Sequence, residues 1–136
     1  MTTETTTPYA ALVLRIGLGS MFIAHAFLKI FVFTPAGTVG FFASLGIPGW
    51  LAYPTIAVEL IGGAMLILGV KARWVSIALI PVLIGTISLV HGSKGWLFTN
   101  EGGGWEYPMF LIVALIAQSL LGNGAFSLQS IFSKNR

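Results

Sequence analysis

The sequence predicts an all-α integral membrane protein: a four-helix bundle of spanning helices, with a short interfacial helix between spans 1 and 2. Three observations lead to this fold class. Of the 136 residues, 56% are hydrophobic and only 8% are charged, and the mean hydropathy is +0.92. A soluble domain carries about 25% charged residues, so this chain could not cover a water-facing surface. Finally, four apolar stretches approach the roughly 20 residues that cross a hydrocarbon core of about 30 Å.

The four stretches form a single membrane domain, residues 1–136, in which the expected spans cover about residues 9–33, 51–70, 74–91 and 105–121. The fourth stretch is short, so we expect Trp105 and Glu106 to join its first turn. Between the first two spans, residues 39–45 read V-G-F-F-A-S-L. This apolar segment among glycines and prolines predicts the short helix in the membrane interface.

Lysine and arginine are unevenly divided between the two ends of the spans. With four spans, one side holds four of them and the other holds two: Lys71, Arg73, Lys134 and Arg136 against Lys29 and Lys94. Loops rich in these residues stay in the cytoplasm. We therefore expect a bacterial inner (plasma) membrane protein with both termini cytoplasmic, and with the histidine-bearing helix ends facing outward.

The composition also excludes several kinds of chemistry. The chain contains no cysteine, which rules out disulfides, thiolate metal sites and cysteine nucleophiles. It contains no flavin-binding or nucleotide-binding motif. Its pI is about 9.6, but the positive charges are few and scattered, so we do not expect nucleic acid as a partner. The expected partners are the lipid bilayer and other membrane or membrane-associated subunits.

Ionisable residues occur inside the expected spans, where each costs about 2.5–3.5 kcal/mol on insertion scales. At about 100° per residue, Arg15, His25 and Lys29 fall within an arc of about 80° on the first helix, which should face the bundle. Glu59 shares its side of the second helix with Gly62 and Gly63, so it should also face protein. We therefore expect Arg15 and Glu59 to form a structural ion pair.

A cluster of polar side chains is expected in the outer half of the bundle. Four spans bring it together from distant parts of the sequence: His25, Lys29, Glu59, His91 and Glu106. The two histidines are the core of this prediction, because they lie at similar depth on separate spans. We expect them to line one cavity, with the lysine and the two glutamates at its walls. The competing interpretation is that these groups only fix the helix register.

Six short motifs follow one another along the chain. They are R-x-G-L-G…F-x-x-H-x-x-x-K at residues 15–29, G-I-P at 46–48, E-L-I-G-G-A-M-L-I-L-G at 59–69, H-G-S-K-G-W at 91–96, G-W-E-Y at 104–107 and F-S-L at 126–128. In this order, over roughly residues 9–132, the sequence resembles the DoxX family of small membrane proteins. Two positions depart from the family pattern: Ala26 stands where glycine is frequent, and Gln129 where aspartate is frequent.

The resemblance implies a four-span protein. It also implies a link to quinone redox chemistry, because some members of the family are a subunit of a thiosulfate:quinone oxidoreductase or are associated with the handling of catechols and quinones. Fold similarity alone does not transfer a function. The residues of this chain therefore have to be weighed directly.

Three kinds of function fit these residues. In the first, the chain is a quinone-linked redox component of a membrane oxidoreductase, in which His25 or His91 bonds the quinone, Glu59 or Glu106 relays protons, and Lys29 stabilises negative charge. The chain would not be catalytic alone, because it lacks an electron carrier of its own. In the second, it is a structural or accessory subunit. In the third, His25 and His91 ligate haem, or a metal ion together with a glutamate. Transport of a small solute is a remaining alternative.

Overall fold

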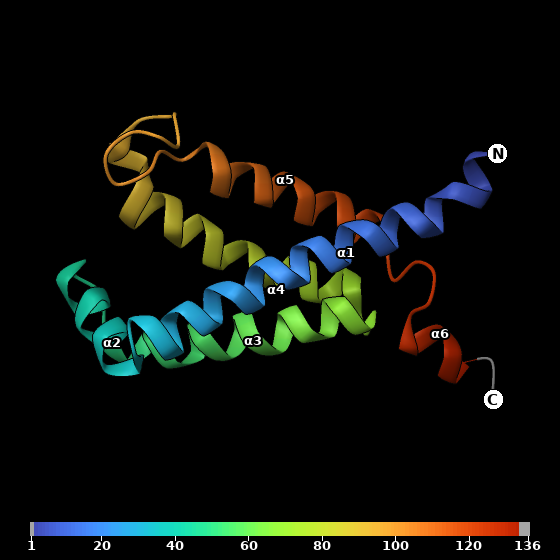
Figure 1. Cartoon of the computed structure of the whole chain (residues 1–136), viewed down its shortest axis with the longest axis horizontal. Coiled ribbons are helices and arrows are strands. Elements are labelled where there is room, and N and C mark those ends of the chain that lie inside the picture. Colours follow the sequence, from blue (N-terminus) through green and yellow to red (C-terminus); the bar gives the residue numbers. More distant parts are fainter. Residues whose placement is uncertain (1, 134–136) are drawn as a thin grey trace.

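The computed structural model describes residues 2–133, which form helices and connecting segments without a β-strand. The helices are α1 (Thr3–Phe27), α2 (Pro35–Ser44), α3 (Ala52–Leu68), α4 (Ala72–Thr86), α5 (Glu106–Leu121) and α6 (Leu128–Ser133) (Figure 1). A π-helical turn extends α1 (η1, Leu28–Val32), and another extends α4 (η3, Ile87–His91). Lys134 and Arg136, which enter the charge count above, lie outside the described residues.

Three helical segments are long and apolar enough to cross a membrane: Thr3–Val32 with 30 residues, Gly49–Leu68 with 20 and Ala72–Lys94 with 23. The fourth apolar helix, α5, has 16 residues, and at 1.5 Å per residue it is about 24 Å long. The protein is thus an all-α membrane helical bundle, as expected from its composition. The short helix expected between the first two spans is present as α2, and it begins earlier than expected, at Pro35.

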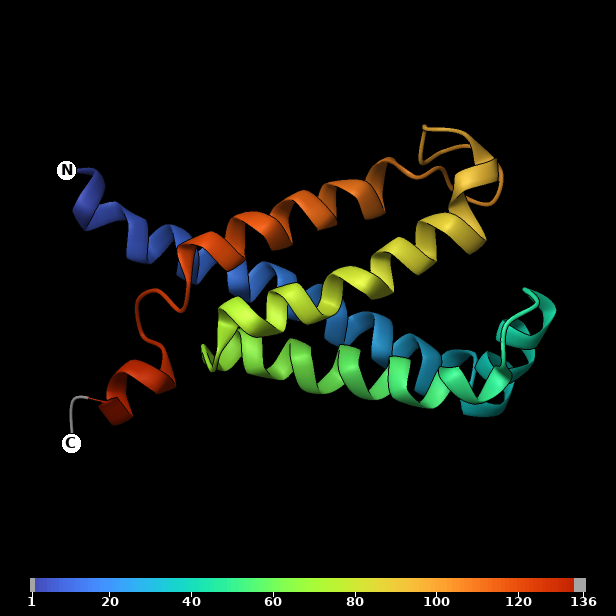
Figure 2. The same cartoon turned by 180° about the vertical axis from the view of Figure 1, so that it is seen from behind.

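The four long helices run along the length of the molecule (Figures 1 and 2). The main helix pairs are α1 with α3 and α4 with α5. The start of α1 and the short helix α6 lie at one end, while α2 and the loop between α4 and α5 lie at the other. This arrangement places the ends of α1 and α4 beside the starts of α3 and α5. The histidine-bearing end is therefore the end away from the termini.

Two glycines set the close contact between α1 and α3. A Cβ atom built on Gly19 would lie 2.6 Å from the carbonyl oxygen of Gly63, and one built on Gly63 would lie 2.8 Å from the carbonyl oxygen of Gly19. Both distances are far below van der Waals contact, so only glycine fits at either position. Small residues allow such close backbone approach between membrane helices.

Arg15 is a structural residue at the end of the bundle near the termini. Its side chain is 1% exposed, and its guanidinium donates to four backbone carbonyls. Two of these, of Leu66 and Ile67, are at the end of α3. The carbonyls of Asn123 and Ala125 accept at 2.8 Å each. The C-terminal end of a helix carries unpaired carbonyls and partial negative charge, so it suits a cation.

The segment after α5 also organises this end of the bundle. Gly122 ends α5 with a φ of 77°, a positive value that glycine adopts readily because it has no Cβ atom. The side-chain oxygen of Asn123 then accepts from the amide of Ala72 at 2.8 Å, at the start of α4. Gln129 accepts from the Lys71 amide at 2.9 Å and from the Asn123 side chain at 3.1 Å. One short segment thereby satisfies groups on α1, on α4 and in the turn before α4.

Candidate functional site

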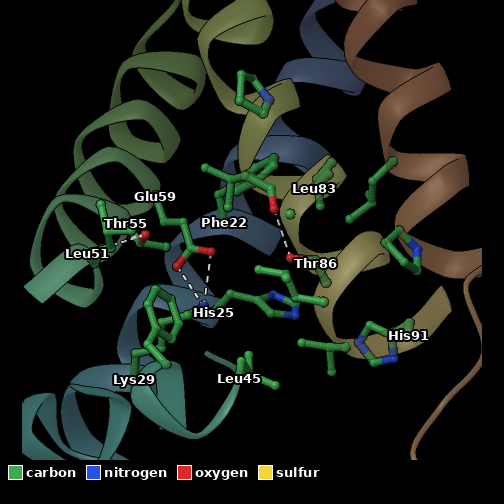
Figure 3. A pocket seen from close by; sticks show the side chains of 18 of the residues that line it. Phe22, His25, Lys29, Leu45, Leu51, Thr55, Glu59, Leu83, Thr86 and His91 are labelled. Carbon is green, nitrogen blue, oxygen red and sulfur yellow. Dashed lines mark hydrogen bonds and ion pairs between the residues drawn. The ribbon is translucent and has the colours of Figure 1, made fainter. Parts of the chain in front are cut away.

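A cavity of about 350 Å³ lies at the end of the bundle away from the termini. All four long helices and the α2 region contribute to its lining, which is mostly apolar and includes Phe22, Phe41, Phe42, Leu45, Leu51, Leu83, Leu89 and Leu111. Its volume falls within the range of about 300–1,000 Å³ found for small-ligand pockets. The polar side chains among these walls are few, and they include His25, Lys29 and Glu59 (Figure 3).

Lys29 and Glu59 form an ion pair at the cavity wall. The Lys29 Nζ atom lies 3.0 and 2.8 Å from the two carboxylate oxygens of Glu59. The Glu59 side chain is 5% exposed and that of Lys29 is 17% exposed. Lys29 belongs to the π-helical turn η1, and π turns are frequent at functional sites because they redirect side chains.

The expected ion pair between Arg15 and Glu59 is therefore wrong: Glu59 pairs with Lys29, and Arg15 with backbone carbonyls. The reason is depth in the bundle. Arg15 precedes Lys29 by 14 positions, which is about 21 Å along a helix. The antiparallel packing of α1 on α3 then places Lys29 level with Glu59, and it places Arg15 level with the end of α3.

His25 projects from α1 into the cavity, and Figure 3 shows its ring beside the Lys29–Glu59 pair. Its Nδ1 atom is 2.9 Å from the carbonyl oxygen of Met21. Its ring stacks on Tyr107 of α5, with the centroids 6.2 Å apart and the planes at 20°. The imidazole is thereby held on both sides, by its own helix and by a neighbouring one.

His91 lines the same cavity from η3 at the end of α4. Its Nδ1 atom is 2.8 Å from the carbonyl oxygen of Gly103, in the loop that leads into α5. The structure thus brings His25, His91, Lys29 and Glu59 to one cavity. Both spans expected to carry a histidine at this end also finish in a π turn, which the sequence did not reveal.

Glu106 does not line this cavity. Its carboxylate accepts from the amide of Phe98 at 3.0 Å, and it lines a separate apolar hollow. His91 and Tyr107 line both the cavity and this hollow. Glu106 is at the first position of α5, so its charge stabilises the start of the helix and the preceding loop. Of the five residues expected in the cluster, it is the one that the structure places elsewhere.

Three polar residues of the cavity were not among the predicted site residues: Thr55, Thr86 and Tyr107. The hydroxyls of Thr55 and Thr86 donate to the carbonyls of Leu51 and Val82, at 2.8 and 2.9 Å. Tyr107 is 39% exposed. It follows Glu106 in the G-W-E-Y motif, which was a signal for it. The threonines carry no such signal, because threonine is common in apolar helices.

A metal site built from a glutamate and two histidines is not supported by the donor set. Within residues 2–133, no three His, Asp or Glu side chains lie close enough together to hold a metal ion. The bis-histidine haem site stays a prediction from the sequence.

Comparisons with known proteins complete the description. The DoxX family model matches residues 10–92, a stretch that includes His25, Lys29, Glu59 and His91. The chain is also 30% identical over 125 residues to a protein of Bacillus subtilis (strain 168) named "Putative oxidoreductase CatD", and the alignment covers 92% of this chain and 88% of that protein. No solved structure matches the chain significantly. Since the family model covers more than half of the chain, this protein belongs to the DoxX family.

Proposed function

We propose that this protein is a quinone-linked subunit of a membrane oxidoreductase complex, and that the cavity receives the quinone headgroup. One observation carries the proposal: α1, α3 and α4, with their π-helical extensions, bring two histidines and a Lys–Glu ion pair to a single apolar cavity within the bundle. Ionisable residues inside membrane helices are costly, and they usually mark ligand or proton pathways.

The residues of the cavity fit a quinone headgroup. Apolar and aromatic walls suit its ring, and the few polar groups suit its two oxygens. The Lys29 ammonium lies on the cavity wall and can donate to these oxygens, and the His25 and His91 rings line the same cavity, where they can accept from the O–H groups of the reduced form. A quinone supplies reversible two-electron chemistry in a lipid-soluble form.

Proton transfer is the part of this chemistry that the chain itself supports. Conversion of a quinone to a quinol takes up two electrons and two protons. Imidazole is the side chain best suited to exchange protons near neutral pH, and the Glu59 carboxylate lies on the wall beside His25. The electrons are carried by a partner subunit, because the chain has no cysteine and no flavin-binding motif. The oxidoreductase name of the Bacillus subtilis relative supports this class of function.

The experiment is to measure quinone bound to the purified protein, using solvent extraction and quantitative lipid analysis. Gly85 lines the cavity, and a Cβ atom there meets no neighbour within 4 Å. Gly85→Phe should therefore fill the cavity while the helix stays intact. We expect the wild type to retain quinone, and Gly85→Phe to lose at least about 90% of it, since a difference of about 1.4 kcal/mol is already tenfold.

The matched control is Gly17→Phe. Gly17 is exposed on α1 and away from the cavity, and it also has no neighbour within 4 Å of its Cβ position. This variant should retain as much quinone as the wild type. The proposal is contradicted if the wild type neither retains nor rebinds quinone, or if both phenylalanine variants behave alike.

A further inference from the structure

The hydrogen-bond polarity of the cavity carries a further inference, which rests on the proposed function. We infer that the cavity binds the reduced quinol in preference to the oxidised quinone. The two forms differ in a simple way. A quinol carries two O–H donors, whereas the oxygens of a quinone can only accept. Which form binds better is therefore decided by the balance of acceptors and donors that the cavity presents.

The two histidines both present an acceptor. In each ring, the Nδ1 atom contacts a backbone carbonyl: that of Met21 for His25, and that of Gly103 for His91. A carbonyl oxygen can only accept, so Nδ1 must carry the hydrogen. In a neutral imidazole the other nitrogen then has no hydrogen and acts as an acceptor. The Nε2 atoms of His25 and His91 are thus two acceptors available to a ligand.

The two threonines add acceptors for the same reason. The hydroxyl hydrogens of Thr55 and Thr86 are used on the carbonyls of Leu51 and Val82. A hydroxyl has a single hydrogen and two lone pairs. Each threonine oxygen can therefore receive a hydrogen bond from a ligand but has none left to donate.

The donors in the lining are fewer. Lys29 has three N–H hydrogens, and its contacts with both oxygens of Glu59 use two of them. One remains, together with the hydroxyl of Tyr107, which has no hydrogen-bond partner within residues 2–133 and can both donate and accept. The cavity thus presents acceptors on His25, His91, Thr55 and Thr86, besides the remaining lone pairs of the Glu59 carboxylate. Against them stand two donors, on Lys29 and Tyr107.

A quinol satisfies this arrangement better than a quinone does. Its O–H groups can donate to the imidazole Nε2 atoms, and its oxygens can still accept from Lys29 or Tyr107. A quinone leaves the imidazole lone pairs without partners in an apolar site, and such unpaired groups are costly. One net hydrogen bond corresponds to roughly tenfold in affinity. We therefore expect at least about tenfold tighter binding of the quinol.

The predicted tautomers of His25 and His91 can be tested without any ligand. The chain contains two histidines, so a tag-free protein labelled with ¹⁵N-histidine gives signals from only two rings. Nitrogen NMR of the neutral rings should show Nδ1 protonated and Nε2 unprotonated in both. Protonated Nε2 atoms in both rings would overturn the inference.

The preference itself is measured with duroquinone and duroquinol as the probe pair. The protein is placed in lipid nanodiscs under anaerobic conditions, and the affinity of each form is determined by calorimetry. Tenfold tighter binding of duroquinol raises the potential of the bound couple by about 30 mV, which a redox titration measures independently. If duroquinone binds as tightly or more tightly, the inference is wrong and the proposed function stands. If neither form binds, the proposed function is wrong.

Two substitutions of Thr86, one without the hydroxyl and one that keeps it, locate the effect. Thr86→Val removes one acceptor and should weaken duroquinol binding several-fold while leaving duroquinone binding unchanged. Thr86→Ser keeps the hydroxyl and should restore the wild-type preference. The control is Ser88→Ala, because Ser88 makes the same kind of bond to its own helix, to Ile84 at 2.8 Å, and is exposed outside the cavity. An equal loss for both probe forms in Thr86→Val would contradict the inference.

Discussion

Arg15 is a buried arginine that has no carboxylate partner among residues 2–133. Its guanidinium donates to carbonyls at the end of α3 and, at the same time, to carbonyls of the segment that follows α5. Lysine has the same charge but concentrates it at one point and offers a different geometry. The requirement at this position is therefore for a guanidinium, which a charge alone would not meet.

We predict that Arg15→Lys lowers the free energy of unfolding by about 3 kcal/mol or more, because hydrogen bonds to charged groups contribute roughly 1.5–3 kcal/mol each. The measurement is a titration with sodium dodecyl sulfate in mixed micelles. Arg73→Lys serves as the control: Arg73 is exposed, and its Nε donates to a single carbonyl, that of Ser119. If Arg15→Lys changes the free energy of unfolding no more than Arg73→Lys does, a positive charge at position 15 is sufficient and the guanidinium is not required.

The sequence located the polar side chains but not all of their partners. Spacing along one helix predicted that Arg15, His25 and Lys29 share a face, since a helix repeats by about 100° per residue. The partner of Glu59 depends instead on how far α1 slides along α3. The reciprocal contact of Gly19 and Gly63 sets that offset, and nothing in the spacing within either helix determines it.

At the scale of the elements, the glycines of α1 illustrate how position decides the effect of a methyl group. Gly17 and Gly19 are two residues apart on the same helix. A Cβ atom on Gly17 meets nothing within 4 Å, whereas one on Gly19 meets the backbone of α3. Both residues are part of the R-x-G-L-G motif, so the motif does not distinguish their roles.

We predict opposite results for the two alanine substitutions. Gly19→Ala should destabilise the protein by about 1–3 kcal/mol, because the helices must separate to admit the methyl group. Gly17→Ala should be neutral or stabilising by up to about 1 kcal/mol, because alanine is the better helix former. The same detergent titration checks both. Equal effects would mean that the contact between α1 and α3 is not tight.

Hydropathy predicted the long helices and the short helix α2 because these depend on local composition. The π turns could not be predicted, since they differ from α-helix by a single extra residue in a turn and no residue type specifies them. The loop before α5 is rich in glycine, a composition typical of flexible segments. It is instead held by the bonds from His91 to Gly103 and from Phe98 to Glu106, which depend on tertiary contacts.

At the scale of the whole molecule, the arrangement of the helices bears on membrane orientation. The start of α1 and the segment after α5 lie at the same end of the bundle (Figure 1). That end carries Lys71 and Arg73, and the positive side of a membrane protein faces the cytoplasm. The length of α5, about 24 Å, is short for a core of about 30 Å, which local thinning of the bilayer accommodates at modest cost.

We predict that both termini face the cytoplasm of a bacterium in which the chain is expressed. A fluorescent protein fused after Arg136 should fluoresce, and alkaline phosphatase fused after Asn100 should be active, because the first reports the cytoplasm and the second the outer side. Exchanging the two reporters should abolish both signals. Phosphatase activity after both positions would mean that α5 does not cross the membrane, and the opposite pattern would reverse the orientation.

Arg15 acquires its hydrogen-bond partners one after another as the chain is synthesised. The arginine is synthesised before the carbonyls of Leu66 and Ile67 at the end of α3, and those of Asn123 and Ala125 follow only after α5. Until the segment after α5 has been synthesised, the charged Arg15 side chain lies in a hydrophobic helix with only two of its four carbonyl partners. A chain that stops after α5 therefore lacks two of the four carbonyls to which Arg15 donates, and it should be less stable than a chain that includes them.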